Sequence, residues 1–361
     1  MKVAIVHDYL IQMGGAERVV AELHAMFPDA PIYTSVCLHD RLLPELKDAD
    51  IRTSFLQFFP FMREEFRIYF LLYPLTFTLF DLSGYDVIIS SSSAYAKGIR
   101  RRKGQFHLCY CHTPMRFAWR FRDYMRNQGW RRLFSPLLSV CMEWLRRWDR
   151  GTTEGIDVFI ANSSFIAERI RSIYGRDSVI IYPPVDTGRF KPAERGGNYF
   201  LIVSRLLFYK RIDIAVEAFT RAGKPLKIVG EGPAESALKR TAGNNIEFLG
   251  RVPDTEVKRL FAECRALVFP GEEDFGITPV EAAASGRPTI AYRAGGALET
   301  VIDGVTGVMF DRQTADSLAD AVVRFESARF DPERLVAHAR KFDRKVFRER
   351  IRGILNENKI L

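Results

Sequence analysis

The stretch PGEEDFGITPVEAAASG, residues 270–286, decides the fold that this sequence predicts. The four residues before it, 266–269, form a short apolar run that is typical of a buried parallel strand. The residues after its acidic loop predict a helix start, with Thr278 at the N-cap, Pro279 at the first helical position and Glu281 in the first turn. A strand, a glycine-containing loop and a helix N-terminus together favour anion binding, because free backbone N–H groups and the helix dipole point toward the ligand.

Two carboxylates flank this turn, Glu273 in the loop and Glu281 in the helix. In these positions they can contact different parts of one ligand. Thr278 and Glu281 equally fit a capping box, in which the Glu side chain bonds the backbone and contacts no substrate. The local pattern leaves both interpretations open.

Further short apolar runs alternate with predicted helices along the whole chain, and this alternation predicts two doubly wound parallel α/β units. In the first half the expected strands are residues 3–6, 31–36, 85–90, 106–111, 157–161 and 178–182. In the second half they are residues 200–203, 227–229, 246–249, 266–269, 289–292 and 308–310. We expect a first domain at 1–190 with an aromatic and basic insert at about 55–150, a second at 191–341, and a terminal helix at 342–361 that crosses back to the first domain. Proline and glycine at residues 184–198 suit a linker.

The composition narrows the class of protein. The 361 residues are 47% hydrophobic and 27% charged, as in a soluble globular protein, and no stretch approaches the roughly 20 apolar residues of a transmembrane helix. The N-terminus does not resemble a signal peptide. Five scattered cysteines predict neither a disulfide framework nor a zinc site, and the DAD triplet at residues 48–50 is interpreted as a solvated turn. We therefore expect a cytosolic protein with no cofactor and no required metal.

One segment carries the positive charge. Residues 97–150 hold 14 Lys and Arg against 3 Asp and Glu, whereas the whole chain has a net charge of +9. Just before them, residues 55–80 are rich in Phe and Tyr but contain only a short apolar run. This aromatic segment predicts either a helix buried under the sheet or one lying in a membrane interface. Aromatic residues followed by cations suit an anionic membrane surface, which we take as a partner.

Several candidate ligand contacts follow strand ends, where open α/β sheets bind ligands. Gly14 and Gly15 separate the first strand from its helix and permit close approach of a ligand, although a plain tight turn explains them equally. His112 follows the strand at 106–111, in a position suited to hydrogen bonding or proton handling. Arg205 and Lys210 follow the strand at 200–203 and can neutralise a diphosphate, although surface charge is the simpler explanation for Lys210.

Three further turns follow strands in the second half. Gly230 begins one of them, and Arg251 and Val252 lie in another that can hold a base through backbone groups. The third turn is Ala294-Gly-Gly296, which precedes a predicted helix.

Glu273-Asp-Phe-Gly276 with Glu281 resembles the E-x7-E motif of retaining glycosyltransferases, and the flanking sequence resembles glycosyltransferase family 4. The turns of the second half stand in the order associated with that family, including Arg205 with Lys210 five residues later. The block YCHTPMR, residues 110–116, resembles a subgroup that builds bacterial lipid-linked polysaccharides such as lipopolysaccharide O-antigen and exopolysaccharide. The resemblance implies a GT-B fold: two facing Rossmann-like domains, with the donor in the second and the acceptor along the first.

The resemblance also implies residue roles and substrates. Glu273 lies by the donor sugar, Glu281 contacts the ribose, His112 contacts the sugar or the incoming hydroxyl, and Gly14 and Gly15 cover the diphosphate or the acceptor. The leaving diphosphate is held by Arg205, Lys210 and the amides of Gly276, Ile277 and Thr278, with Phe275, Gly230, Arg251 and Val252 also binding the donor.

The resemblance predicts transfer of mannose from GDP-mannose to a lipid-linked oligosaccharide at the inner face of the cytoplasmic membrane. Transfer from a UDP-sugar stays open, and so does a basic nucleic-acid-binding or membrane-binding protein without catalysis. We expect no nucleic acid partner, because no recognised nucleic-acid-binding module is present.

Overall fold

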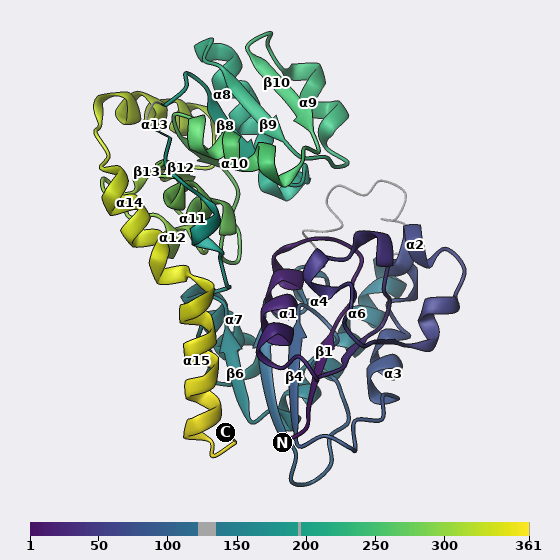
Figure 1. Cartoon of the computed structure of the whole chain (residues 1–361). Coiled ribbons are helices and arrows are strands. Elements are labelled where there is room, and N and C mark those ends of the chain that lie inside the picture. The colour runs from purple at the N-terminus through teal and green to yellow at the C-terminus, as the bar shows by residue number, and fades with distance from the viewer. Residues whose placement is uncertain (122–134, 194–195, 361) are drawn as a thin grey trace. The chain divides into compact units, whose positions relative to one another are not determined.

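The structure is a computed structural model, and it describes residues 1–121, 135–193 and 196–360 (Figure 1). The chain divides into two compact units. The first contains Met1–Tyr182 together with Arg348–Leu361, and the second contains Pro183–Phe347. The chain therefore passes from one unit to the other twice.

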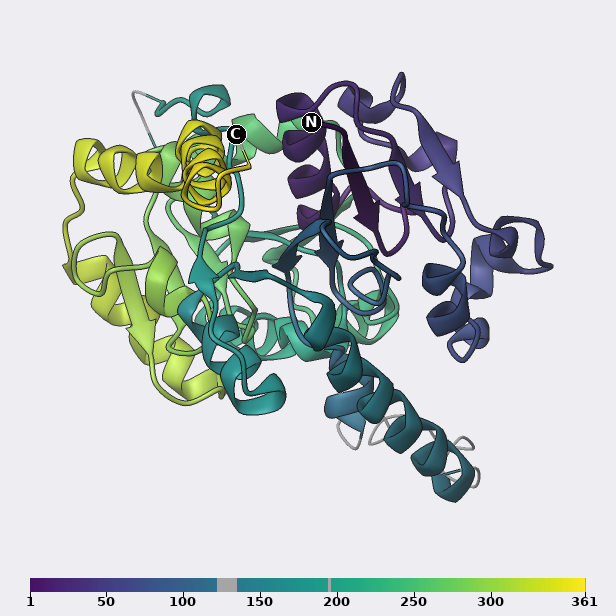
Figure 2. The same ribbon diagram turned by 90° about the horizontal axis from the view of Figure 1, so that it is seen from below.

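The first unit is built on a seven-stranded sheet in the order β3-β2-β1-β4-β5-β6-β7, and every pairing in it is parallel. The strands are β1 (Val3–His7), β2 (Ile32–Thr34), β3 (Ile51–Thr53), β4 (Val87–Ser92), β5 (Phe106–Cys111), β6 (Val158–Ala161) and β7 (Val179–Ile180). The helices are α1 (Gly15–Met26), α2 (Met62–Glu65), α3 (Tyr73–Thr78), α4 (Arg116–Trp119), α6 (Ser135–Gly151) and α7 (Ser164–Tyr174). The α6 helix projects away from the rest of its unit (Figure 2).

The second unit repeats this plan with six parallel strands in the order β10-β9-β8-β11-β12-β13. The strands are β8 (Phe200–Val203), β9 (Leu226–Val229), β10 (Ile246–Gly250), β11 (Leu267–Phe269), β12 (Thr289–Tyr292) and β13 (Gly307–Phe310). Its helices are α8 (Ile212–Ala222), α9 (Glu235–Thr241), α10 (Asp254–Glu263), α11 (Ile277–Ala284), α12 (Ala297–Thr300), α13 (Ala315–Ser327) and α14 (Pro332–Ala339), and α15 (Arg344–Glu357) follows them. The predicted pair of doubly wound parallel sheets is confirmed.

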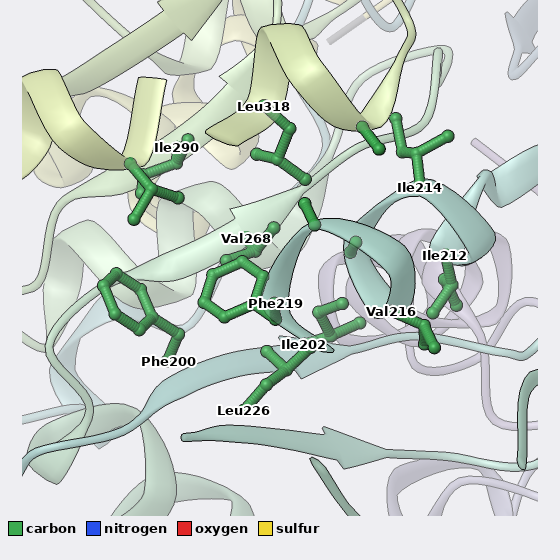
Figure 3. Packing of buried hydrophobic residues seen from close by; sticks show 14 of the residues in the cluster. Phe200, Ile202, Ile212, Ile214, Val216, Phe219, Leu226, Val268, Ile290 and Leu318 are labelled. Carbon is green, nitrogen blue, oxygen red and sulfur yellow. The ribbon is translucent and has the colours of Figure 1, made fainter. Parts of the chain in front are cut away.

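Buried side chains from strands and helices form the core of each unit. In the second unit Phe200, Phe219, Val268 and Leu318, from β8, α8, β11 and α13, meet in one cluster (Figure 3). Helix ends are set locally, as at α7, where the Ser163 side chain accepts from the N–H of Ile166 and Gly175 ends the helix at a φ of 64°. After α14, Arg348 of α15 pairs with Glu22 of α1, inside the first unit.

The aromatic segment is not a single helix. Residues 55–80 form four short helical pieces, η3 (Phe55–Phe58), α2, η4 (Phe66–Tyr69) and α3. Proline accounts for part of the break, because Pro74 lies in the first turn of α3 and cannot continue an earlier helix. The segment is both buried and exposed: Tyr73 and Phe77 are in the core, whereas Phe58 is 87% exposed. Farther along the predicted aromatic and basic insert, α4 ends at Trp119 and α6 begins at Ser135, and residues 122–134 lie outside the described part of the chain.

Candidate active site

The polar residues of the second unit lie at the point where the order of its strands along the sheet reverses. β8 and β11 are neighbours, although β9 and β10 separate them in the chain. Loops that follow two such strands leave toward opposite faces of the sheet, and open α/β sheets bind ligands in the crevice between them. The loop after β8 contains Arg205 and Lys210, and the loop after β11 contains Glu273 and Gly276.

Lys210 and Glu273 form an ion pair across these two loops. Their side chains are 13% and 21% exposed, so neither is a free surface charge. The loop backbones also touch: a Cβ on Gly271 would lie 2.8 Å from the carbonyl oxygen of Lys210. Behind them, Gln313 donates to the carbonyl of Pro270 over 3.0 Å and accepts from Arg211 over 3.2 Å. The pair is therefore held by contacts from three loops.

The start of α11 differs from the prediction. Its N-cap is Gly276, at a φ of 91°, and Thr278 is already inside the helix. Thr278 therefore does not cap the helix, and the proposed capping box between Thr278 and Glu281 is wrong. The left-handed backbone at Gly276 turns the chain directly from the acidic loop into the helix, which favours glycine there. As a result the first N–H groups of α11 directly follow the loop that carries Glu273.

Glu281 lies on α11 and is 5% exposed. A carboxylate can accept several hydrogen bonds, so a ligand hydroxyl can bond to Glu281 in addition to its contacts within the protein. Together with Glu273 it gives this unit two carboxylates beside one helix start.

Several glycines of this unit are required by loop packing. A Cβ on Gly230 would lie 2.0 Å from the carbonyl oxygen of Ser204, and one on Gly296 would lie 2.2 Å from the Cα of Phe275. The amide of Gly296 donates to the carbonyl of Glu273 over 2.8 Å. The glycine turn before α12 therefore packs against the backbone of the acidic loop and bonds to it.

The remaining donor-site candidates differ in how far their side chains are exposed to solvent. Arg205 is exposed, whereas Lys210 is mostly covered, which reverses their expected environments. Arg251 is exposed and Val252 is half-buried, after β10. The Phe275 side chain is buried against Phe342, with ring centroids 5.6 Å apart.

In the first unit the strand order reverses between β1 and β4, which lie side by side (Figure 1). We call this point the strand reversal of the first unit. Here Asp8, which follows β1, is 1% exposed. Its carboxylate accepts from four successive backbone N–H groups of the turn after β4, those of Ser93, Ala94, Tyr95 and Ala96. Asp8 has no predicted role, because nothing near it in the chain signals the turn that it binds.

Gly14 and Gly15 lie at the start of α1 in this reversal. The N–H of Gly14 donates to the carboxylate of Glu17 over 3.0 Å, and a Cβ on Gly14 would lie 2.6 Å from that carboxylate. Burial raises the pKa of Glu17 above its usual value. These contacts fit the tight-turn explanation of Gly14.

His112 lies at the end of β5 and is 8% exposed. Its Nε2 is 2.8 Å from the hydroxyl of Ser91, and its carbonyl accepts from the side chain of Asn162 over 3.0 Å. Burial lowers the pKa of His112 to about 3, so the ring is neutral near pH 7. The next residue, Thr113, has a buried hydroxyl without a hydrogen-bond partner among the described residues. A substrate hydroxyl is a suitable partner for it.

No helix in the described ranges is long and apolar enough to cross a bilayer. No group of three or more His, Cys, Asp or Glu in the same part of the chain is placed to hold a metal ion.

Two doubly wound parallel sheets, each with polar residues where its strand order reverses, define the class of proteins built from two Rossmann-like domains. Residues 13–189 match the family model described as Glycosyltransferase Family 4, and residues 185–342 match the one described as Glycosyl transferases group 1. The two matches run through both units, and the chain belongs to glycosyltransferase family 4.

Relatives and a solved structure agree with this assignment. O-antigen chain mannosyltransferase C of Escherichia coli is 34% identical over 135 residues, which are 35% of this chain and 36% of that protein. A GDP-mannose-dependent phosphatidylinositol monomannoside mannosyltransferase of Mycobacterium tuberculosis is 33% identical over 226 residues, 54% of this chain and 56% of that protein. The chain thus matches less than two thirds of either relative.

The crystal structure of Anabaena HepE in complex with UDP has a TM-score of 0.73 to this chain at 17% identity. The alignment covers 99% of this chain and 100% of HepE. This likeness shows the fold, and the predicted GT-B fold class is confirmed.

Proposed function

We propose that this protein is a retaining glycosyltransferase that moves a sugar from a nucleotide donor to a lipid-linked glycan. The observation that carries the proposal is the Lys210–Glu273 pair beside the N-terminus of α11. A cation, a carboxylate and the N–H groups at a helix N-terminus are the groups needed to bind a sugar diphosphate.

In the proposed reaction the bond between the anomeric carbon and the diphosphate oxygen breaks, and its electron pair leaves with the nucleoside diphosphate. The acceptor hydroxyl bonds to the anomeric carbon from the same face and gives its proton to the departing phosphate oxygen. Arg205, Lys210 and the amides of Gly276 to Thr278 stabilise the growing negative charge, which makes their contribution largest in the transition state. Glu273 positions the sugar, Glu281 the ribose, and His112 the sugar or incoming hydroxyl.

The proposed donor is GDP-mannose and the proposed acceptor is a lipid-linked oligosaccharide of a bacterial surface polysaccharide. The names of the two mannosyltransferase relatives support this choice. A thermal-shift panel of GDP, UDP, ADP and their sugars tests it. We expect GDP and GDP-mannose to raise the melting temperature most, and preferential stabilisation by UDP-sugars would overturn the donor assignment.

We also propose that the first unit binds the inner face of the cytoplasmic membrane. Along the aromatic segment large apolar side chains are exposed: Phe58 87%, Phe61 68%, Ile68 51%, Leu71 41%, Leu75 52% and Leu79 61%. A soluble protein rarely exposes so many neighbouring apolar side chains without a partner.

The basic loop at residues 100–103 lies close to this apolar surface. Gln105 donates to the carbonyls of Leu82 and Tyr85 over 2.6 and 2.7 Å, which ties the loop to the chain just after Leu79. Arg101, Arg102 and Lys103 also line a pocket of about 420 Å³. This pocket is at the amino end of β5, the sheet edge opposite His112. Apolar side chains next to cations suit an anionic lipid surface.

Vesicle flotation tests the membrane proposal. The protein should float with vesicles that contain phosphatidylglycerol, less so with pure phosphatidylcholine, and binding should weaken with salt. Leu75→Glu with Leu79→Glu should abolish flotation, whereas Val323→Glu, at a 63% exposed position of the second unit, should not. Equal flotation of both variants would contradict the assigned surface.

A further inference from the structure

Ser91 of β4 lies between two histidines of neighbouring strands. Its hydroxyl is 3.2 Å from Nδ1 of His7 and 2.8 Å from Nε2 of His112, and its carbonyl oxygen is 2.9 Å from Nδ1 of His7. Ser91 is fully buried and His7 is 2% exposed. The Ser91 hydroxyl therefore has these two histidine nitrogens as its hydrogen-bond partners.

The carbonyl of Ser91 identifies the proton positions. A carbonyl oxygen accepts only, so Nδ1 of His7 carries a proton and donates to it. The same N–H points near the Ser91 hydroxyl oxygen, which leaves the hydroxyl proton to be donated elsewhere. The hydroxyl donates to Nε2 of His112, and a neutral His112 then carries its own proton on Nδ1.

The adjacent pair on β4 shows the same arrangement with no ambiguity. The hydroxyl of Ser90 is 2.8 Å from Nε2 of His107, and Nδ1 of His107 is 3.0 Å from the carbonyl of Gly155. Since that carbonyl requires a donor, Nδ1 of His107 is protonated and Nε2 accepts from Ser90. Ser90 and Ser91 are successive residues of one strand, so their side chains lie on opposite faces of the sheet.

We propose that Ser91 is a positioning residue that holds His112 with its proton on Nδ1, so that His112 offers the substrate a hydrogen-bond donor and not a base. The low pKa of the buried ring agrees with a neutral His112. For the reaction this inference rests on the proposed function: the Nδ1–H donates to an oxygen of the sugar or of the incoming hydroxyl. His112 does not remove the acceptor proton, which leaves with the diphosphate.

Two-bond proton–nitrogen NMR spectra of the full chain, labelled with 15N-histidine, test the inference directly. The chain has six histidines, and the signals of His112 are identified by their loss in His112→Gln. At pH 7.5 without substrate we expect His112 protonated on Nδ1 only. Ser91→Ala should move His112 toward the Nε2–H tautomer, whereas Ser90→Ala should change the His107 signals and leave His112 as it was.

A His112 protonated on Nε2 in the unsubstituted protein would overturn the proposal, and that measurement needs no variant to fold. So would a His112 spectrum that Ser91→Ala leaves unchanged. In turnover, Ser91→Ala should lower kcat about tenfold, the worth of one hydrogen bond, with KM for the donor unchanged. Because the tautomer is read without substrate, failure of the proposed transferase activity leaves the spectroscopic result intact.

Discussion

Lys97 and Asp149 form an ion pair inside the first unit, with side chains 2% and 0% exposed. The second carboxylate oxygen of Asp149 accepts from the indole of Trp119 and from the hydroxyl of Tyr174, each over 2.7 Å. Lys97 also donates to the carbonyl of Ala94, in the turn that Asp8 binds. Burial opposes a charged Lys97, but Asp149 outweighs it and holds the pKa of Lys97 above its usual value. This pair joins α6 to the strand reversal of the first unit.

We expect Asp149→Asn to lower the free energy of unfolding by about 3–5 kcal/mol, because it leaves a buried charge uncompensated. Urea denaturation measures the loss. The matched control is Asp177→Asn, which breaks the exposed Arg171–Asp177 pair, whose side chains are 68% and 87% exposed. That change should cost less than about 1 kcal/mol. Similar losses in both variants would show that burial of the Lys97–Asp149 pair has no special weight.

Lys210→Ala should lower kcat by about 100-fold or more, because a charge that stabilises the leaving diphosphate is removed. Steady-state kinetics with GDP-mannose provide the measurement, and circular dichroism checks the fold. Lys239→Ala removes a 53% exposed cation from α9 of the same unit and should leave kcat unchanged. A Lys210→Ala enzyme with near-normal kcat would remove Lys210 from the reaction.

Glu281→Gln should raise KM for the donor about tenfold with little change in kcat, as expected when a contact to the ribose is lost equally from the ground and transition states. The substitution keeps the size of a side chain that is 5% exposed, so the fold should survive. A large fall in kcat at constant KM would instead place Glu281 at the reacting sugar.

Gly296→Ala should destabilise the second unit by about 2 kcal/mol or more and should reduce the thermal shift caused by GDP. The reason is steric, since the new methyl group would lie 2.3 Å from the carbonyl oxygen of Phe275. Gly353→Ala is the contrasting change. It lies in α15, where its Cβ position has no heavy atom within 4 Å beyond the helix's own nearby backbone, and it should stabilise the protein by about 0.5–1 kcal/mol. Thermal denaturation with and without GDP measures both variants.

Acid should destabilise the first unit through His107. Burial lowers the pKa of His107 to about 4 from its ordinary value of 6.5, so the unfolded chain takes up the proton first as the pH falls. His107 thus stabilises the fold fully above pH 6.5, and about 3 kcal/mol is lost as the pH falls from there toward 4. Denaturant unfolding at pH 7 and pH 5 should show a smaller difference for His107→Gln than for the unsubstituted protein. His39→Gln, at an exposed position, should leave that difference unchanged, and an unaltered acid response in His107→Gln would refute the assignment.

The strands and their parallel arrangement follow from local information. Residues 106–111, 200–203 and 289–292 are apolar runs set between turn residues, and a doubly wound sheet is the structure that buries such runs on both faces. The carboxyl ends of parallel strands lie at one edge, so Lys210 and Glu273 were predicted at the same edge although 63 residues separate them. The E-x7-E pattern and its flanking turns are also local features, so they indicated the family from the sequence alone.

Tertiary structure decided the rest, because the partners of a buried polar group are chosen in space and leave no local pattern. The aromatic segment was predicted as one helix, but its division into a core side and an exposed side depends on how each piece meets the sheet. Gly276 took the N-cap from Thr278 because the loop had to turn through a left-handed backbone. Asp8 finds its four N–H donors, and Ser91 its two histidines, only once β1, β4 and β5 are side by side. The sequence by itself determined every strand except the short β3 (Ile51–Thr53) and which edge bears the chemistry, and packing determined the contacts that fix each side chain.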